Sequence, residues 1–156
     1  MDESLPAIAR VVIQQCSSRC HRFVAADTLL GELHMDPSPS ATFVDARGRR
    51  ARLGWASLWR HEYKLWRGGV ECAAAQVDFQ SGRIDIQVKT QRFLLQSLGS
   101  DAYTWRLTDV AEQPRLTVTQ RALGDAAIDV HTPVSLDLLV LAYYLAVVGL
   151  RTHQQA

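Results

Sequence analysis

The feature that most constrains this chain is an apolar run at residues 136–150, in which Asp137 is the only charged side chain. Ser135 before the run suits the N-cap of a helix, and the Asp137 carboxylate suits the positive end of the helix dipole. Gly149 suits the opposite end. The pattern predicts a helix over about 135–150. Fifteen helical residues span about 22 Å, less than the roughly 30 Å of a bilayer core, so the run favours a buried helix over a membrane span.

This helix has no polar face, because every residue after Asp137 in the run is apolar or a tyrosine. A helix that is apolar all round must be surrounded by other apolar groups. A sheet packed on one side would leave half of the helix in water, whereas a sheet closed into a barrel would cover every side and remove the open edges. The length of 156 residues, 47% of them hydrophobic, predicts one domain over residues 1–156.

Most of the remaining chain shows apolar side chains at every second position, the pattern of half-buried strands. Residues 84–89 show it clearly. Residues 4–16 and 55–66 also fit a near-helical spacing, and we favour strand for both because their neighbours are strand-like. The other candidate strands are 10–15, 22–26, 29–34, 42–44, 49–55, 61–65, 70–79, 103–108, 116–119 and 126–131. Together these segments predict about ten or eleven short antiparallel strands.

The expected fold class is mainly β (α+β), an antiparallel meander β-barrel wrapped around one hydrophobic C-terminal α-helix. Its element order resembles the tubby C-terminal-like superfamily, nearest to the LURP-one-related and phospholipid scramblase-like branch. Residues 11–15 (VVIQQ) resemble the opening strand of that family, and residues 22–31 resemble the next strand, turn and strand. Residues 42–48 resemble its repeated D-x-x-G hairpin, and 129–130 followed by 135–150 resemble its last strand and central helix. The resemblance implies this fold and a lipid-related function, but it transfers no functional residues.

A local cluster of positive charge is the strongest candidate site. The formal net charge is only +1, which excludes a uniformly basic nucleic-acid binder. Between residues 47 and 67, however, seven basic residues and one acidic residue, Glu62, give a local charge of +6. Arginine binds phosphate through a bidentate fork and tryptophan favours the membrane interface, so we predict an anion-binding or lipid-binding site. Its residues are Arg47, Arg49, Arg50, Arg52, Arg60, Lys64 and Arg67, together with Trp59 and Trp66.

The alternative interpretation of this cluster is a solvated outer face, with the tryptophans in the core. If Ala51, Leu53 and Trp55 face the core, then Arg50 and Arg52 point outward together on one strand. The partner expected for a binding site here is an anionic phospholipid or membrane surface, and we do not expect nucleic acid.

The three cysteines, Cys16, Cys20 and Cys72, leave one unpaired in any arrangement, and the acidic N-terminus does not resemble a secretory signal. We therefore expect free thiols in a reducing cytoplasm. A zinc site is only weakly suggested by the spacing of Cys16, Cys20 and His21, with His34 downstream. We interpret them as two reduced thiols and a loop histidine, and we expect no metal. Fifteen arginines against two lysines are typical of a GC-rich, bacterial genome.

The sequence contains no G-x-S-x-G, H-E-x-x-H, P-loop or G-x-G-x-x-G motif. Asp129 and His131 share a strand face and could form an acid–base pair, whereas the adjacent His61 and Glu62 point to opposite faces. We interpret these groups as outward polar residues and Asp137 as a helix-start residue. The expected function is therefore a non-enzymatic binding module without a cofactor, cytoplasmic and peripheral to the membrane, that associates with phospholipid through the arginines and tryptophans. The alternative is a protein–protein interaction or scaffold protein with no lipid activity.

Overall fold

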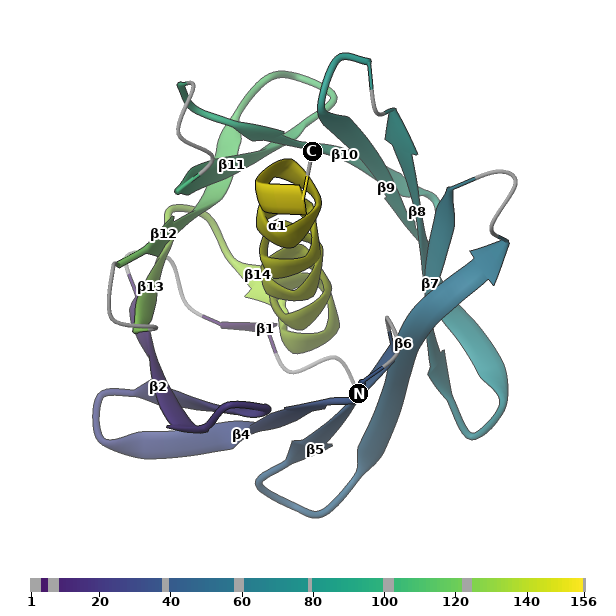
Figure 1. Ribbon diagram of the computed structural model, residues 1–156. Helices are drawn as coiled ribbons and strands as arrows, with labels where there is room; N and C mark the ends of the chain where they lie inside the picture. Colours follow the sequence, from purple (N-terminus) through teal and green to yellow (C-terminus); the bar gives the residue numbers. More distant parts are fainter. Residues whose placement is uncertain are drawn as a thin grey trace.

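The computed structural model describes residues 4–5, 9–37, 40–57, 61–78, 80–99, 103–121 and 125–155. Over these residues the chain forms a closed barrel of twelve antiparallel strands around one helix, α1 (Leu136–Gln155) (Figure 1). The barrel strands are β2 (Ala9–Ser17), β3 (Cys20–Ala25), β4 (Thr28–Met35), β5 (Ser40–Asp45), β6 (Arg50–Ser57), β7 (Glu62–Arg67), β8 (Val70–Asp78), β9 (Arg83–Val88), β10 (Gln91–Ser97), β11 (Thr104–Asp109), β12 (Pro114–Gln120) and β13 (Ala126–Val130). The predicted fold class is confirmed.

Each barrel strand pairs with the next along the chain, and the barrel closes where β13 pairs with β2. Two short strands, β1 (Ser4–Leu5) and β14 (Val134–Ser135), form a separate antiparallel pair, and β14 leads directly into α1. Apart from the closing β13–β2 pair, every pairing in the wall joins two strands that are consecutive along the chain.

The structure confirms the eleven predicted strand positions and adds a twelfth barrel strand, β10, together with the short pair β1 and β14. The sequence pattern missed β10 because Phe93, Leu94 and Leu95 are consecutive apolar residues and hide the period of two. The two ambiguous segments contain strands. In the first segment, β2 covers most of residues 4–16, and in the second, β6 and β7 cover residues 55–57 and 62–66.

The core of the protein is α1 and the inward residues that surround it. Every residue from 138 to 147 is at most 8% exposed. Tyr143 lies inside the barrel, where its Oη is 2.8 Å from Nδ1 of the buried His21. Leu53 and Leu95 come from different parts of the wall, and both are fully buried. The apolar helix is therefore enclosed by the barrel of its own chain.

The helix is longer than the sequence predicts. Its backbone stays helical through Gly149 and ends at Gln155, so the expected end near residue 150 is wrong. A single glycine is tolerated inside a helix and does not end it alone. Among the described residues, no helix has both the length and the apolar character needed to cross a membrane.

The cysteines also differ from the prediction. Cys16 and Cys20 form a disulfide, so the expected reduced thiols are wrong at these two positions, while Cys72 is free and half-buried. The β2–β3 hairpin explains the bond, because a register shift between Gln15 and Ser17 brings the Cα atoms of the two cysteines to 5.3 Å. His21 is likewise not a loop residue, since it lies in β3 and faces the core.

Two hairpins of the barrel, β5–β6 and β11–β12, share one turn geometry. Asp45 and Asp109 each accept hydrogen bonds from the backbone N–H groups two and four residues later, at 2.9–3.0 Å. The residue three positions after each aspartate has a positive φ, 81° at Gly48 and 62° at Glu112. Glycine adopts this backbone conformation without steric cost. A residue with a Cβ atom, such as Glu112, is strained in it.

Replacing Glu112 by glycine should therefore stabilise the protein. We expect Glu112→Gly to raise the free energy of unfolding by about 1 kcal/mol, because it relieves the left-handed backbone conformation. The matched change Gly48→Ala should lower it by a similar amount. Urea denaturation of the three proteins measures both effects, and a loss of stability in Glu112→Gly would contradict the shared geometry.

A charge in the middle of α1 should prevent folding. Leu141 is 0% exposed, and a carboxylate there would be buried without a partner. We expect Leu141→Asp to abolish the cooperative thermal transition followed by circular dichroism. Val110→Asp is the control, because Val110 is 81% exposed and its replacement should leave the transition unchanged. A normal melt for Leu141→Asp would rule out the enclosed helix.

Candidate functional site

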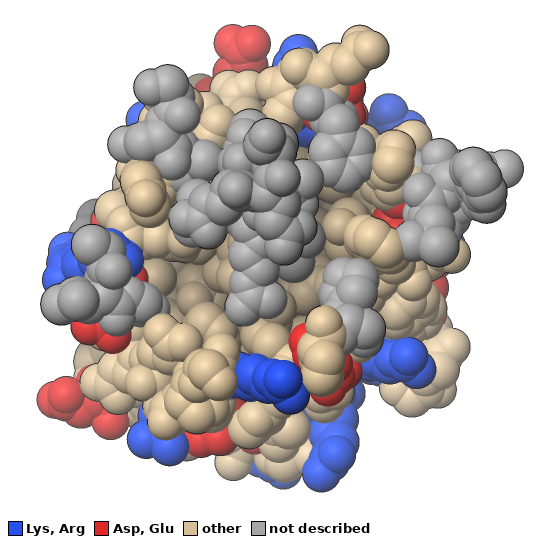
Figure 2. All heavy atoms as spheres, viewed as in Figure 1, with Lys and Arg blue, Asp and Glu red and all other residues tan. Residues whose placement is uncertain are grey.

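The predicted basic cluster does not form one positive surface. Figure 2, which shows the molecule in the same view as Figure 1, has Lys and Arg mixed with Asp and Glu around the periphery. Three of the predicted basic residues pair with acids: Arg49 Nε lies 2.8 Å from Asp45 Oδ2, and Lys64 pairs with Glu62 and Glu71. The third, Arg67, pairs with Asp137. Three acids from outside the sequence window, Asp45, Glu71 and Asp137, therefore offset about half of the local charge of +6.

Other members of the cluster are placed differently. Trp59 and Arg60 lie outside the described residues. Arg47 lies in the β5–β6 turn, where its backbone N–H donates to the Asp45 carboxylate at 2.9 Å. Trp55 is opposite the buried Tyr63, and their ring centroids are 5.9 Å apart, so it is on the inward side of β6 with Ala51 and Leu53, although it is 45% exposed.

Arg50, Arg52 and Trp66 come together on the outer wall of the barrel. Arg52 is directly opposite Trp66 on β7, and Arg50 lies two residues away on the same strand as Arg52. Both arginines are exposed, and neither has a carboxylate partner among the described residues. We call these three residues, with the turn residues Gly68 and Gly69, the Arg50–Arg52 face.

The Arg50–Arg52 face borders a shallow hollow of about 660 Å³. Gly68 and Gly69 have φ angles of 56° and 79°, and a Cβ atom added to either would meet no atom within 4 Å. Thr42 of β5 also lines the hollow. The glycines leave the space beside the guanidinium groups open to a ligand. Thr42 and both glycines were not predicted as site residues from the sequence, although the Gly-Gly pair that begins two residues after Trp66 is a turn signal.

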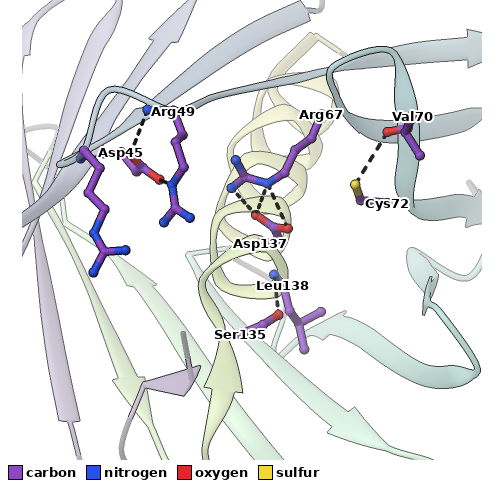
Figure 3. A network of polar contacts seen from close by, with 9 residues as sticks. Asp45, Arg49, Arg67, Val70, Cys72, Ser135, Asp137 and Leu138 are labelled. Atoms are coloured by element: carbon purple, nitrogen blue, oxygen red, sulfur yellow. Dashed lines mark hydrogen bonds and ion pairs between the residues drawn. The ribbon is translucent and has the colours of Figure 1, made fainter. Parts of the chain in front are cut away.

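A second cavity, of about 550 Å³, lies where α1 begins. Figure 3 shows Arg67 and Asp137 pointing toward one another here, with Cys72 nearby. Arg67 Nε donates to both Asp137 oxygens at 3.1 Å, and this hydrogen bonding raises the pKa of the Arg67 guanidinium. Ser135 Oγ accepts the N–H of Leu138 at 3.2 Å and caps the helix as predicted. Arg67 is thus held in an ion pair at the start of α1 and is less exposed than Arg50 and Arg52.

Asp45 lies at the same end of the barrel (Figure 3) and is almost fully buried. Burial alone raises the pKa of its carboxyl, but hydrogen bonds from the Arg49 and Arg47 amides and from the Arg49 guanidinium outweigh burial. The net pKa of Asp45 therefore lies below its ordinary value. The Asp45 and Asp137 carboxylates hold Arg49 and Arg67 in place, which leaves the Arg50–Arg52 face as the better candidate for an external anion.

The possible acid–base groups do not meet. Asp129 lies 3.9 Å from Arg10, and His131 Nε2 lies 2.8 Å from Thr117 Oγ1. Glu62 pairs with Lys64. These side chains take different partners on the outer wall.

No family model and no curated protein matches this chain. A crystal structure of an Arabidopsis thaliana protein, AT5G01750, has a similar fold, with a TM-score of 0.63. The match covers 97% of this chain and 94% of that protein, at 12% sequence identity. At this identity the similarity shows a shared fold alone, a closed antiparallel barrel around a C-terminal helix.

The contact between Arg67 and Asp137 should contribute measurably to stability. We expect Arg67→Met and Asp137→Asn each to lower the free energy of unfolding by about 2 kcal/mol, because each leaves a half-buried charged or polar partner unsatisfied. The double variant should lose about 1 kcal/mol less than the two single losses together.

The exposed pair Arg10–Asp129 is the matched control, since its atoms are 3.9 Å apart and both side chains are about half exposed. Its double-mutant cycle should give a coupling below about 0.5 kcal/mol. Equal couplings for the two pairs in urea denaturation would contradict a structural role for Arg67.

Proposed function

We propose that this chain is a non-enzymatic binding module that associates with anionic phospholipid at a membrane surface through the Arg50–Arg52 face. The observation that carries this proposal is a pair of exposed arginines without carboxylate partners, beside a half-buried tryptophan and an open hollow. The other cations of the predicted cluster whose ion pairs are described, Arg49, Lys64 and Arg67, are bound to acids of the same chain.

The chemistry of the face suits a phosphorylated headgroup. Each guanidinium presents a planar fork that matches phosphate oxygens. Residues two apart on a strand are about 7 Å apart and share one side, so Arg50 and Arg52 can contact neighbouring phosphates or two sides of one headgroup. Trp66 adds a flat ring of the kind enriched at the membrane interface. The contacting groups lie on the outer wall, so the proposed association is peripheral.

The resemblance to tubby-like, LURP-one-related and scramblase-like proteins, noted from residues 11–15, 22–31 and 42–48, also favours a lipid-related function. A cytoplasmic location and a bacterial source stay predictions. The Cys16–Cys20 disulfide removes one premise of the cytoplasmic assignment, because disulfides persist mainly in oxidising compartments.

Reversing the charge of the face should weaken membrane association. We expect the parent protein to sediment with vesicles that contain phosphatidylserine but not with phosphatidylcholine vesicles, and to release as salt rises. Arg50→Glu/Arg52→Glu should lower the affinity at least about thirtyfold, since each basic residue near an anionic surface contributes about 1 kcal/mol. Trp66→Ala should weaken binding without changing its salt dependence.

The matched control is Arg92→Glu/Arg106→Glu, which makes the same change in net charge at two exposed arginines of β10 and β11. It should retain most of the binding if the face is specific. Equal losses in the two double variants would indicate only a general charge effect and would contradict the proposed face. No binding by the parent protein would contradict the lipid function itself.

A second candidate function is protein contact without lipid activity. It is favoured by a row of apolar side chains on the outer wall, where Val24 lies opposite both Val12 and Leu29. Val12 is 40% exposed and Leu29 is 41% exposed. Neighbouring exposed apolar groups are typical of interaction surfaces. The vesicle experiment separates the two functions, because this one predicts no binding to either lipid.

A further inference from the structure

Three potential metal ligands gather on the outer wall where β3 and β4 pair. Cys20 is directly opposite His34, and Glu32 lies two residues before His34 on the same face. One ligand atom from each side chain lies within 4.8 Å of the other two. The three side chains are half-buried or exposed, so a metal ion could reach them from solvent.

The distances within this group match the edges of a tetrahedral zinc site. Glu32 Oε1 lies 3.8 Å from Cys20 Sγ and 3.4 Å from His34 Nε2. Zinc bonds of about 2.0 Å to nitrogen or oxygen and about 2.3 Å to sulfur place tetrahedral ligand atoms about 3.3–3.5 Å apart. A zinc ion would therefore require only small movements of these three side chains.

The disulfide places the sulfur of Cys16 directly beside that of Cys20, and therefore next to this group. The sulfur atoms of a disulfide are not thiolates and do not bind zinc as cysteine does. We propose that reduction of the Cys16–Cys20 disulfide creates a zinc site whose ligands are Cys16, Cys20, Glu32 and His34. A dithiol reductant supplies the two electrons and two protons, and is itself oxidised to a disulfide. The two new thiols then release their protons as zinc binds.

Arg22 is a positioning residue for this site. Its Nε and Nη2 atoms both lie 3.2 Å from Glu32 Oε2, which leaves Oε1 facing Cys20 and His34. Carboxylate ligands of metals are commonly oriented by such a hydrogen bond. Two thiolates and one carboxylate bring three negative charges, and Zn²⁺ with the Arg22 guanidinium brings three positive charges. The occupied site is therefore electrically neutral.

The structure changes the ligand set that the sequence suggested. His21 follows Cys20 directly, but it faces the core and contacts Tyr143, so it cannot join an outer-wall site. Glu32 takes its place, because cross-strand pairing puts it beside Cys20 although it is twelve residues away.

The test uses the full chain, oxidised or reduced with dithiothreitol and then desalted anaerobically. Zinc is titrated against a chelating dye, and cobalt(II) is used as a spectroscopic probe. The reduced protein should bind one zinc at least a hundredfold more tightly than the oxidised protein. Bound cobalt should show sulfur-to-metal charge-transfer absorption, which requires thiolate ligands. Zinc should also raise the melting temperature of the reduced protein alone.

Variants separate this site from other thiols. His34→Ala and Glu32→Gln should each weaken zinc binding at least tenfold in the reduced protein, and Cys16→Ser/Cys20→Ser should abolish it. Cys72→Ser is the matched control, since it removes the free thiol and should leave binding unchanged. Equal weak binding by reduced and oxidised parent protein would overturn the proposal, as would zinc affinity that survives the double cysteine variant or is lost in Cys72→Ser.

Discussion

The rest of the structure depends on the burial of one helix that has no polar face. Residues 138–147 of α1 are all buried, and inward side chains such as Phe23, Leu53 and Leu95 enclose them. A sheet that covers a helix on every side has to close, so the pairing of β2 with β13 follows from that burial. Closure commits the inner face of each strand to the core. Contacts with other molecules are left to the outer wall and the two ends of the barrel.

Most of this fold can be predicted from the sequence because an inner face and an outer face of different polarity produce a period of two. The signal fails where the outer face is also apolar. Leu94 is only half exposed between the buried Phe93 and Leu95, so the centre of β10 is three consecutive apolar residues and does not alternate in polarity. The prediction of where α1 ends fails for a different reason, because Gly149 permits a helix to end but does not require it.

The candidate site was predicted less well, because a charge count along the chain omits partners from distant segments. Arg67 pairs with Asp137, 70 residues away, and Lys64 pairs with Glu71 across a hairpin. Both partners lie outside the sequence window that suggested the cluster. Alternation did predict the shared outward face of Arg50 and Arg52, since that depends only on their spacing along β6. Sequence reasoning thus found which arginines share a face, but not which ones lack an acid.

One cross-strand row on the outer wall connects the two proposed sites, because His34 is opposite Thr42, and Thr42 is opposite Arg52. Two strand spacings separate His34 from Arg52 by about 10 Å, close to the screening length at physiological salt. A net charge at the zinc site would therefore act on the arginines. The oxidised cluster contains the ion pair of Arg22 and Glu32, and the zinc-loaded cluster is also neutral. The two functions can thus share one wall without electrostatic interference, and each can be tested while the other is unchanged.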